Sequence, residues 1–268
     1  MTDEEAAKLL VSVHRSRGQT TISKAVKLLV AAHRSRKPAA IGDLPLKTEK
    51  DAYRVQDAVF AELWPGTRPA AWKAGGPSDK TEPTAAPIAP DKLLRSPASI
   101  AAASMNMVGV EAELAFRLSK DLPPRGRAYS ERRVAAAVGE VLVAIELCDT
   151  RLANWKESSG VWKLADFQNN GGLVAGSGTR DWQKIDFLKQ EVEFRIGARV
   201  VKAKGAHSFG NPFRLMPWIA NHCTTRGIGL RAGDIVTTGA WTGLEIAKAG
   251  DEVTARFPGI GEATVRIG

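Results

Sequence analysis

Two segments with a two-residue alternation constrain the fold of this chain most. In the stretch from 108 to 118, apolar side chains alternate with Glu111, Glu113 and other residues, which is the period of a β-strand. Glu111 and Glu113 are therefore expected on one face of that strand. A second alternating run, from 141 to 148, carries Glu146 among apolar neighbours. The two strands together are expected to place three carboxylates in a largely apolar sheet.

Burying these three carboxylates is costly unless a cation or hydrogen-bond donors replace their lost hydration. A hard divalent cation would meet that need for all three, and oxygen ligands with exchangeable positions suit Mg²⁺ or Mn²⁺. The alternative is that the glutamates lie on solvated strand faces or pair with Arg117 and Arg151, since alternating charge is the ordinary pattern of a half-exposed strand. The apolar neighbours of Glu146 favour a metal site.

Length and composition indicate a globular protein. Its 268 residues are 44% hydrophobic, enough for a substantial core, and no apolar run approaches the ~20 residues of a membrane helix. The N-terminus lacks the charge order of a secretory signal, so a cytoplasmic protein without membrane contact is expected. Cys148 and Cys223 indicate neither a disulfide framework nor a zinc site. Cys148 falls on the face of Glu146, where it either lines the site or packs as a small hydrophobe.

The formal net charge of +9 raises nucleic-acid binding as a competing function. The basic residues are scattered, and they do not interleave with aromatic residues as in a recognisable nucleic-acid-binding module. A cationic field that attracts small anionic acids accounts for the same charge. No nucleic-acid partner is therefore expected.

The first third of the chain is expected to be helical and then proline-rich. The near-repeat KLLVSVHRSR at 8–17 and KLLVAAHRSR at 27–36 predicts two related amphipathic helices. The opening ~20 residues are interpreted as an extension or a duplicated start of the chain. A further helix is predicted over 48–64, capped by Thr48, and a loop or connection without long regular elements over 65–97.

The remaining part of the chain is expected to be mainly β. From residue 106 onward, strand-like periods alternate with turns, and one helix is predicted at 213–225. The chain is therefore expected to be an α+β protein with a helical region and connection over 1–98, followed by a β-rich core over 99–268.

Several segments resemble the 2-keto-4-pentenoate hydratase family of the fumarylacetoacetate hydrolase superfamily: VGVEAELAF, AIELCDTR, KLAD before GG, and LRAGDIVTTGAWTG. The resemblance covers about residue 25 to the C-terminus. It implies a mainly β roll or sandwich core with a smaller helical N-terminal part, and commonly a homo-oligomer. It also implies that Glu111, Glu113 and Glu146 bind Mg²⁺ or Mn²⁺ and that the cation holds a small anionic 2-oxo acid.

The resemblance also assigns residues around the metal. Lys73, in WKAG, matches a lysine of the family's active site and is expected either to transfer protons or to hold the substrate carboxylate. Arg151 and Lys163 are expected to meet an anionic substrate, although Arg151 alternatively pairs with Asp149 or another carboxylate. Substrate contacts are further assigned to three polar residues of the matching segments, Asn169, Asn170 and Thr242.

The chain departs from the family pattern at two places. The segment KTEPTAAPIAP lacks the aspartate that usually follows the lysine, and Asn169 and Asn170 stand where serines usually precede the GG. An amide orients water but is not a general base near neutral pH. The hydration step therefore lacks its usual groups, and Glu82 and Asp79 are the candidates to replace them.

The expected function is that of a divalent-metal lyase acting on small 2-oxo or 2-hydroxydienoate acids. The family default is hydration of 2-hydroxypenta-2,4-dienoate to 4-hydroxy-2-oxopentanoate in aromatic catabolism. A chelated 2-oxo acid with a stabilised enolate also serves decarboxylation and carbon–carbon cleavage. The alternatives are a 2-oxo acid decarboxylase, an acylpyruvate or fumarylacetoacetate-type hydrolase, and a non-catalytic metal-binding partner subunit.

Overall fold

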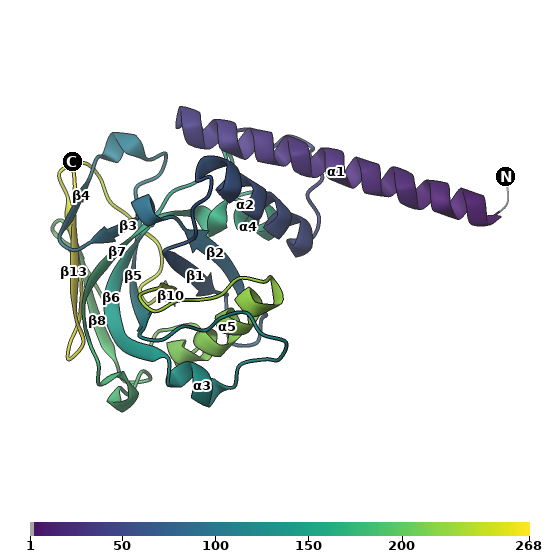
Figure 1. Ribbon diagram of the computed structural model, residues 1–268. Helices are drawn as coiled ribbons and strands as arrows, with labels where there is room; N and C mark the ends of the chain where they lie inside the picture. The colour runs from purple at the N-terminus through teal and green to yellow at the C-terminus, as the bar shows by residue number, and fades with distance from the viewer. Residues whose placement is uncertain (1–2) are drawn as a thin grey trace. The chain divides into compact units, whose positions relative to one another are not determined.

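The computed structural model describes residues 3–268 and the side chains of residues 19–268, and these form two compact units (Figure 1). One unit, called the helical unit here, comprises the chain up to Thr67 together with Thr150–Asn169. The other, the β-rich unit, comprises Arg68–Asp149 and Asn170–Gly268. No helix in the described part of the chain is long and apolar enough to cross a membrane.

The helical unit contains α1 (Asp3–Ser35), α2 (Glu49–Leu63), α4 (Gly160–Ala165) and the short helix η3 (Phe167–Asn169). The prediction of two helices for the near-repeat is wrong, because α1 runs through both copies. The linking sequence GQTTISKAV has no proline, and its single glycine does not stop a helix. The predicted extension falls on residues whose side chains lie outside the described part.

Helix α2 confirms the helix that the sequence predicts over 48–64. The side chain of Thr48 accepts a hydrogen bond from the backbone N of Asp51, which satisfies one of the free donors at the helix start. The buried face of the helix carries four apolar residues and one polar residue, and its members are Ala52, Val55, Gln56, Val59 and Phe60.

The β-rich unit is built from two sheets. The larger sheet has the strand order β2-β1-β10-β5-β6-β7-β3, with β11 paired to β5, and the smaller has the order β4-β13-β12-β8-β9. The bounds are β1 (Ala71–Gly75), β2 (Thr84–Ile88), β3 (Leu93–Arg95), β4 (Ala98–Ile100), β5 (Gly109–Leu118), β6 (Val138–Cys148), β7 (Asn170–Thr179), β8 (Glu191–Ile196), β9 (Arg199–Lys204), β10 (Ile235–Ala240), β11 (Glu245–Ile246), β12 (Glu252–Phe257) and β13 (Gly261–Ile267). The unit also contains the α-helices α3 (Glu131–Ala135) and α5 (Leu215–Thr225) and the short helices η1 (Pro90–Lys92), η2 (Ala102–Ser104), η4 (Trp182–Lys184) and η5 (Pro212–Arg214).

The two sheets pack face to face, and β13 lies against β6 and β7 (Figure 1). One face of β5 supplies Val110, Leu114 and Phe116 to the core between them, because alternate side chains of a strand point to the same side. The rings of Trp182 and Phe213 stack in this core at 4.9 Å, and Phe116 meets Trp182 edge-on. The expected α+β fold with a β sandwich core is confirmed, as is the helix predicted at 213–225.

The division into units differs from the boundary that the sequence predicts at residue 98. The proline-rich segment and the residues just after it form four strands of three to five residues. Three of them, β1, β2 and β3, belong to the larger sheet, and β4 belongs to the smaller one. Pro87 lies in the edge strand β2, where a residue without a backbone N–H is tolerated. Residues 150–169, in turn, belong to the helical unit. No long regular element occurs over the described residues 65–97, as predicted.

Candidate metal centre

Strands β5 and β6 place the three glutamates on one face of the larger sheet. The antiparallel register sets Glu111 opposite Glu146, and Glu113 opposite Ala144. This face is the one turned away from Val110, Leu114 and the core between the sheets. Glu113 and Glu146 are completely buried and Glu111 is half-buried, so the solvated-strand alternative does not hold for the first two.

The neighbouring strand β10 holds one oxygen of Glu113. The hydroxyl of Thr237 donates a short hydrogen bond to Oε2 of Glu113, and the backbone N of Gly239 donates to the same oxygen at 3.0 Å. Gly239 has φ of +105°, in the left-handed region that favours glycine. The other oxygen, Oε1, is buried without a hydrogen-bond partner among the described residues. Thr237 and Gly239 were not predicted, since TTGA reads as an ordinary strand segment.

Glu146 likewise has one oxygen with hydrogen-bond partners and one without, among the described residues. Its Oε1 accepts hydrogen bonds from Nζ of Lys73 at 2.8 Å and from Nδ2 of Asn170 at 2.9 Å. Lys73 comes from β1 and Asn170 from the start of β7, so with β5, β6 and β10 five neighbouring strands of one sheet contribute to this cluster. Oε2 of Glu146 is buried and has no hydrogen-bond partner in the described part of the protein.

Burial and mutual repulsion control protonation at this cluster. Burial, followed by the negative charges of Glu146 and Glu111, raises the pKa of Glu113 well above its usual range. Glu111 has a raised pKa, again mainly through burial, and the ammonium of Lys73 opposes the rise. Burial alone would lower the pKa of Lys73, but Glu146 and Glu111 raise it well above normal. Lys73 is therefore a fixed positive charge when only the protein's own groups surround it.

The residues of this cluster fit a divalent cation. Two completely buried carboxylates each present an oxygen that lacks a hydrogen-bond partner among the described residues, which is costly unless something positive faces them. One ligand atom each from Glu111, Glu146 and Cys148 lie within 4.8 Å of one another, a spacing that one ion can span. Glu113 lies beside this trio on the same strand face as Glu111 but is not part of it.

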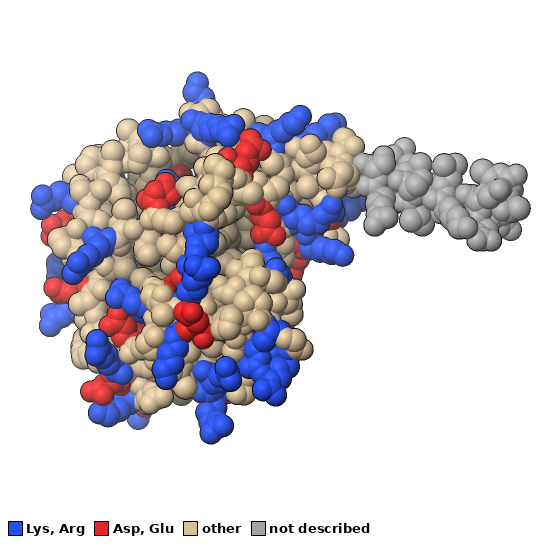
Figure 2. Space-filling view, in the orientation of Figure 1, with Lys and Arg blue, Asp and Glu red and all other residues tan. Residues whose placement is uncertain are grey.

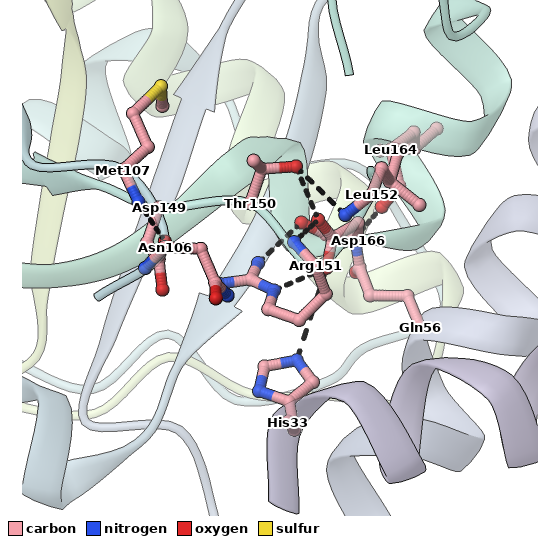
Figure 3. A network of polar contacts seen from close by, with 10 residues as sticks. All are labelled: His33, Gln56, Asn106, Met107, Asp149, Thr150, Arg151, Leu152, Leu164 and Asp166. Atoms are coloured by element: carbon pink, nitrogen blue, oxygen red, sulfur yellow. Dashed lines mark hydrogen bonds and ion pairs between the residues drawn. The ribbon is translucent and has the colours of Figure 1, made fainter. Parts of the chain in front are cut away.

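Three of the predicted substrate residues belong to the helical unit and have contacts there. Nε of Arg151 donates to Oδ1 of Asp166 at 2.6 Å, and the backbone N of Arg151 donates to Oδ2 at 2.9 Å (Figure 3). This is the alternative in which Arg151 pairs with a carboxylate, with Asp166 as the partner. Lys163 lies over the ring of Trp155, and Asn169 has φ of +57° at the end of η3. Their roles toward substrate stay predictions.

Asp149 belongs to the β-rich unit and organises the entry to β5. Its Oδ1 accepts the backbone N–H groups of Asn106 and Met107 at 2.8 and 2.9 Å (Figure 3). The segment before β5 is thereby tied to the end of β6, which holds the Glu111 and Glu146 strands at their shared end. Asp149 is therefore occupied by backbone donors.

Three further candidates from the sequence, Asp79, Glu82 and Thr242, lie in the β-rich unit. Asp79 forms an ion pair with Arg214, and Glu82 accepts a hydrogen bond from Nε1 of Trp218, so both candidate bases have surface partners. Thr242 is half-buried just after β10, and its hydroxyl is buried with no hydrogen-bond partner in the described residues. Thr242 is thus available to a ligand, and its role stays a prediction.

Known proteins resemble this chain in both sequence and fold. The family model "Fumarylacetoacetate (FAA) hydrolase C-terminal" matches residues 68–268. The 2-keto-4-pentenoate hydratase 1 of Dechloromonas aromatica is 30% identical over 166 residues, which cover 62% of this chain and 62% of that protein. A 2-keto-4-pentenoate hydratase of Paraburkholderia phymatum is 30% identical over 160 residues, covering 59% and 60%. The chain thus spans about three fifths of the length of the curated relatives that it matches.

Solved structures extend the likeness to most of the chain. The 4-oxalocrotonate decarboxylase from Pseudomonas putida G7, complexed with magnesium and adipate, has a TM-score of 0.80 at 22% identity and covers 93% of this chain and 97% of its own. At that identity the likeness shows a shared fold. The family model covers the entire sequence from Arg68 to the C-terminus, including the strands that carry the three glutamates. The chain therefore belongs to the fumarylacetoacetate hydrolase family, as the resemblance of its motifs predicts.

Proposed function

We propose that this protein is a divalent-metal-dependent lyase for small 2-oxo or 2-hydroxydienoate acids, with Glu111, Glu113 and Glu146 holding Mg²⁺ or Mn²⁺. The observation that carries the proposal is the pair of buried carboxylate oxygens, on Glu113 and Glu146, that have no hydrogen-bond partner among the described residues. When bound, the cation would hold the 2-oxo acid and stabilise negative charge on its enolate. We further propose a cytoplasmic homo-oligomer.

Other residues of the β-rich unit would bind the substrate or position the glutamates. When only the protein's own groups surround it, Lys73 keeps its proton because Glu146 and Glu111 raise its pKa, and this positive charge would hold the substrate carboxylate. Beside a bound cation that offsets those carboxylates, Lys73 could instead transfer a proton. Asn170 donates to Glu146 and positions that carboxylate. Thr237 and Gly239 hold Oε2 of Glu113 in the same way, so Oε1 of Glu113 and Oε2 of Glu146 are the oxygens that would bind the cation.

Hydration of 2-hydroxypenta-2,4-dienoate is the first candidate reaction. The relatives named as 2-keto-4-pentenoate hydratases, and a 2-hydroxyhexa-2,4-dienoate hydratase of Comamonas testosteroni at 28% identity, support this substrate class. Decarboxylation of a 2-oxohexenedioate is the second candidate. It is favoured by the amides of Asn169 and Asn170, which cannot activate water as bases, since loss of carbon dioxide needs no activated water.

Product analysis with the full chain separates these reactions. The protein with Mg²⁺ or Mn²⁺ is incubated with each acid, and the products are identified by nuclear magnetic resonance against a protein-free control. We expect 4-hydroxy-2-oxopentanoate from the dienoate, whereas carbon dioxide from the hexenedioate would identify a decarboxylase. Glu113→Gln is expected to abolish either reaction. Metal binding without turnover on both acids and on an acylpyruvate would identify a non-catalytic subunit, and absence of metal binding would refute the proposal.

A further inference from the structure

Cys148 lies beside Glu111 and Glu146 and not in an apolar core. It occupies the end of β6 two residues beyond Glu146, so both side chains are on the same face of the strand. Its sulfur and one oxygen each of Glu111 and Glu146 lie within 4.8 Å of one another. Cys223, by contrast, packs inside the main hydrophobic cluster with residues of α5. A buried thiol with only a packing role is expected in surroundings like those of Cys223.

The opposite strand leaves room for this thiol. Gly109 is the partner of Cys148 across the sheet, and a Cβ at position 109 would approach both the Cβ of Cys148 and Cδ1 of Leu244 to 2.8 Å. Such a contact is shorter than carbon atoms tolerate, so the glycine keeps a side chain out of the space beside Cys148. The sulfur therefore reaches the carboxylates without competition from the facing residue.

A second, independent observation indicates that this corner of the cluster receives a ligand. Oε2 of Glu146 is completely buried and has no hydrogen-bond partner among the described residues, although Oε1 of the same group has two. A buried carboxylate oxygen in that position needs a cation or a donor. The oxygen and the thiol belong to residues on the same face of one strand, so one ion can contact both.

We propose that Cys148 is a ligand of the bound cation together with Glu111 and Glu146, which makes the site selective for divalent cations that accept sulfur. This inference rests on the proposed function, because it concerns the same cation. Mg²⁺ and Mn²⁺ would bind through oxygen atoms, whereas Co²⁺, Zn²⁺ and Cd²⁺ would gain a bond to the thiolate. Formation of that bond transfers the thiol proton to solvent, so binding of these cations releases one more proton than binding of Mg²⁺.

Absorption spectroscopy tests the inference directly, with Cd²⁺ and Co²⁺ as probes of the full chain. A thiolate bound to either ion gives a ligand-to-metal charge-transfer band that oxygen ligands do not give. We expect the band in the wild type and in the control variant Cys223→Ser, and no band in Cys148→Val or Cys148→Ser. We also expect the ratio of Cd²⁺ to Mg²⁺ affinity to fall at least about tenfold in both Cys148 variants.

Mn²⁺ binding, followed by electron paramagnetic resonance, separates failure of this inference from failure of the proposed function. If the wild type binds Mn²⁺ and Cd²⁺ without a charge-transfer band, or if the band survives in both Cys148 variants, the thiol is not a ligand and the inference is wrong. If the band is lost in Cys223→Ser, the wrong thiol has been assigned. If neither ion binds to the wild type, the proposed function fails together with the inference.

Discussion

Thr237→Val is a substitution whose effect follows from one hydrogen bond at the centre of the cluster. Thr237 is completely buried, and its hydroxyl donates to Oε2 of Glu113. Valine keeps the shape of the side chain but removes the donor. Loss of a hydrogen bond to a charged acceptor costs about 1.5–3 kcal/mol of unfolding free energy, compared with about 0.5–1.5 kcal/mol for a neutral acceptor.

The adjacent residue provides a matched control. Thr238 is also completely buried in β10, but its hydroxyl donates to the backbone carbonyl of Leu114, which is neutral at every pH. Thr238→Val is therefore expected to lower the unfolding free energy by about 0.5–1.5 kcal/mol, and by the same amount at every pH. The difference between the two variants then reports the charge on Glu113.

The pH dependence of that difference has a definite sign. Burial and the neighbouring carboxylates raise the pKa of Glu113 in the folded protein, so its contribution to stability is present at low pH and is lost as pH rises through the folded pKa. The bond from Thr237 favours the charged form and limits this loss. Thr237→Val is therefore expected to become more destabilising as pH rises through the pKa of Glu113 in the folded protein, which lies well above the usual value for a glutamate.

Urea denaturation in the presence of a chelator, at several values between pH 5 and pH 8, measures these free energies. The expected result is a gap between the two variants that widens with pH and reaches about 1–2 kcal/mol. Equal destabilisation by Thr237→Val and Thr238→Val at every pH would refute the reasoning that Glu113 is a buried, titrating carboxylate held by Thr237.

Two further substitutions test the electrostatics. Lys73→Met removes the ammonium group that pairs with Glu146 and is expected to lower the unfolding free energy by about 3–5 kcal/mol at pH 8 in the presence of a chelator. Replacing the chelator with Mn²⁺ is expected to restore part of this loss, and an unchanged denaturation midpoint in the variant would contradict the prediction. Burial, and then the charge of Arg226, lowers the pKa of His222 to about 4 from 6.5, so its contribution to stability is lost as pH falls through that window. His222→Gln should remove up to about 3 kcal/mol of this acid sensitivity, and an identical pH profile in wild type and variant would count against the assigned burial.

Alternation along the sequence predicts the positions of the glutamates well, because the two-residue period of a strand holds in any sheet. The shared face of Glu111 and Glu113, and the burial of Glu146, are therefore visible before the fold is known. The facing register of Glu111 and Glu146 is a tertiary property. It depends on where β5 and β6 pair, which no local pattern specifies.

The remaining parts of the cluster come from distant segments. Lys73 reaches Glu146 because β1 joins the sheet through β10, and the proline-rich sequence around β1 conceals the strand. Thr237 carries no signal of its own, since threonine is common in strands. The family resemblance identified Lys73, but only the structure pairs it with Glu146.

Positive charge is distributed over one face of the molecule together with negative charge. On the face shown in Figure 2, Lys and Arg side chains are spread among Asp and Glu and do not form one continuous patch. Several charges of the described residues form ion pairs, including Arg117 with Glu140 and Arg199 with Glu245. The positive charge is therefore dispersed on the face shown, and the absence of a nucleic-acid partner stays a prediction.

A crystal structure of the full chain grown with Mn²⁺ and oxalate locates the cation without any assumption about its ligands, because Mn²⁺ scatters anomalously. We expect one strong anomalous peak on the carboxylate face of β5 and β6, with oxygens of Glu111, Glu113 and Glu146 and of oxalate around it. A fully occupied peak elsewhere, or none at this face at saturating Mn²⁺, would contradict it.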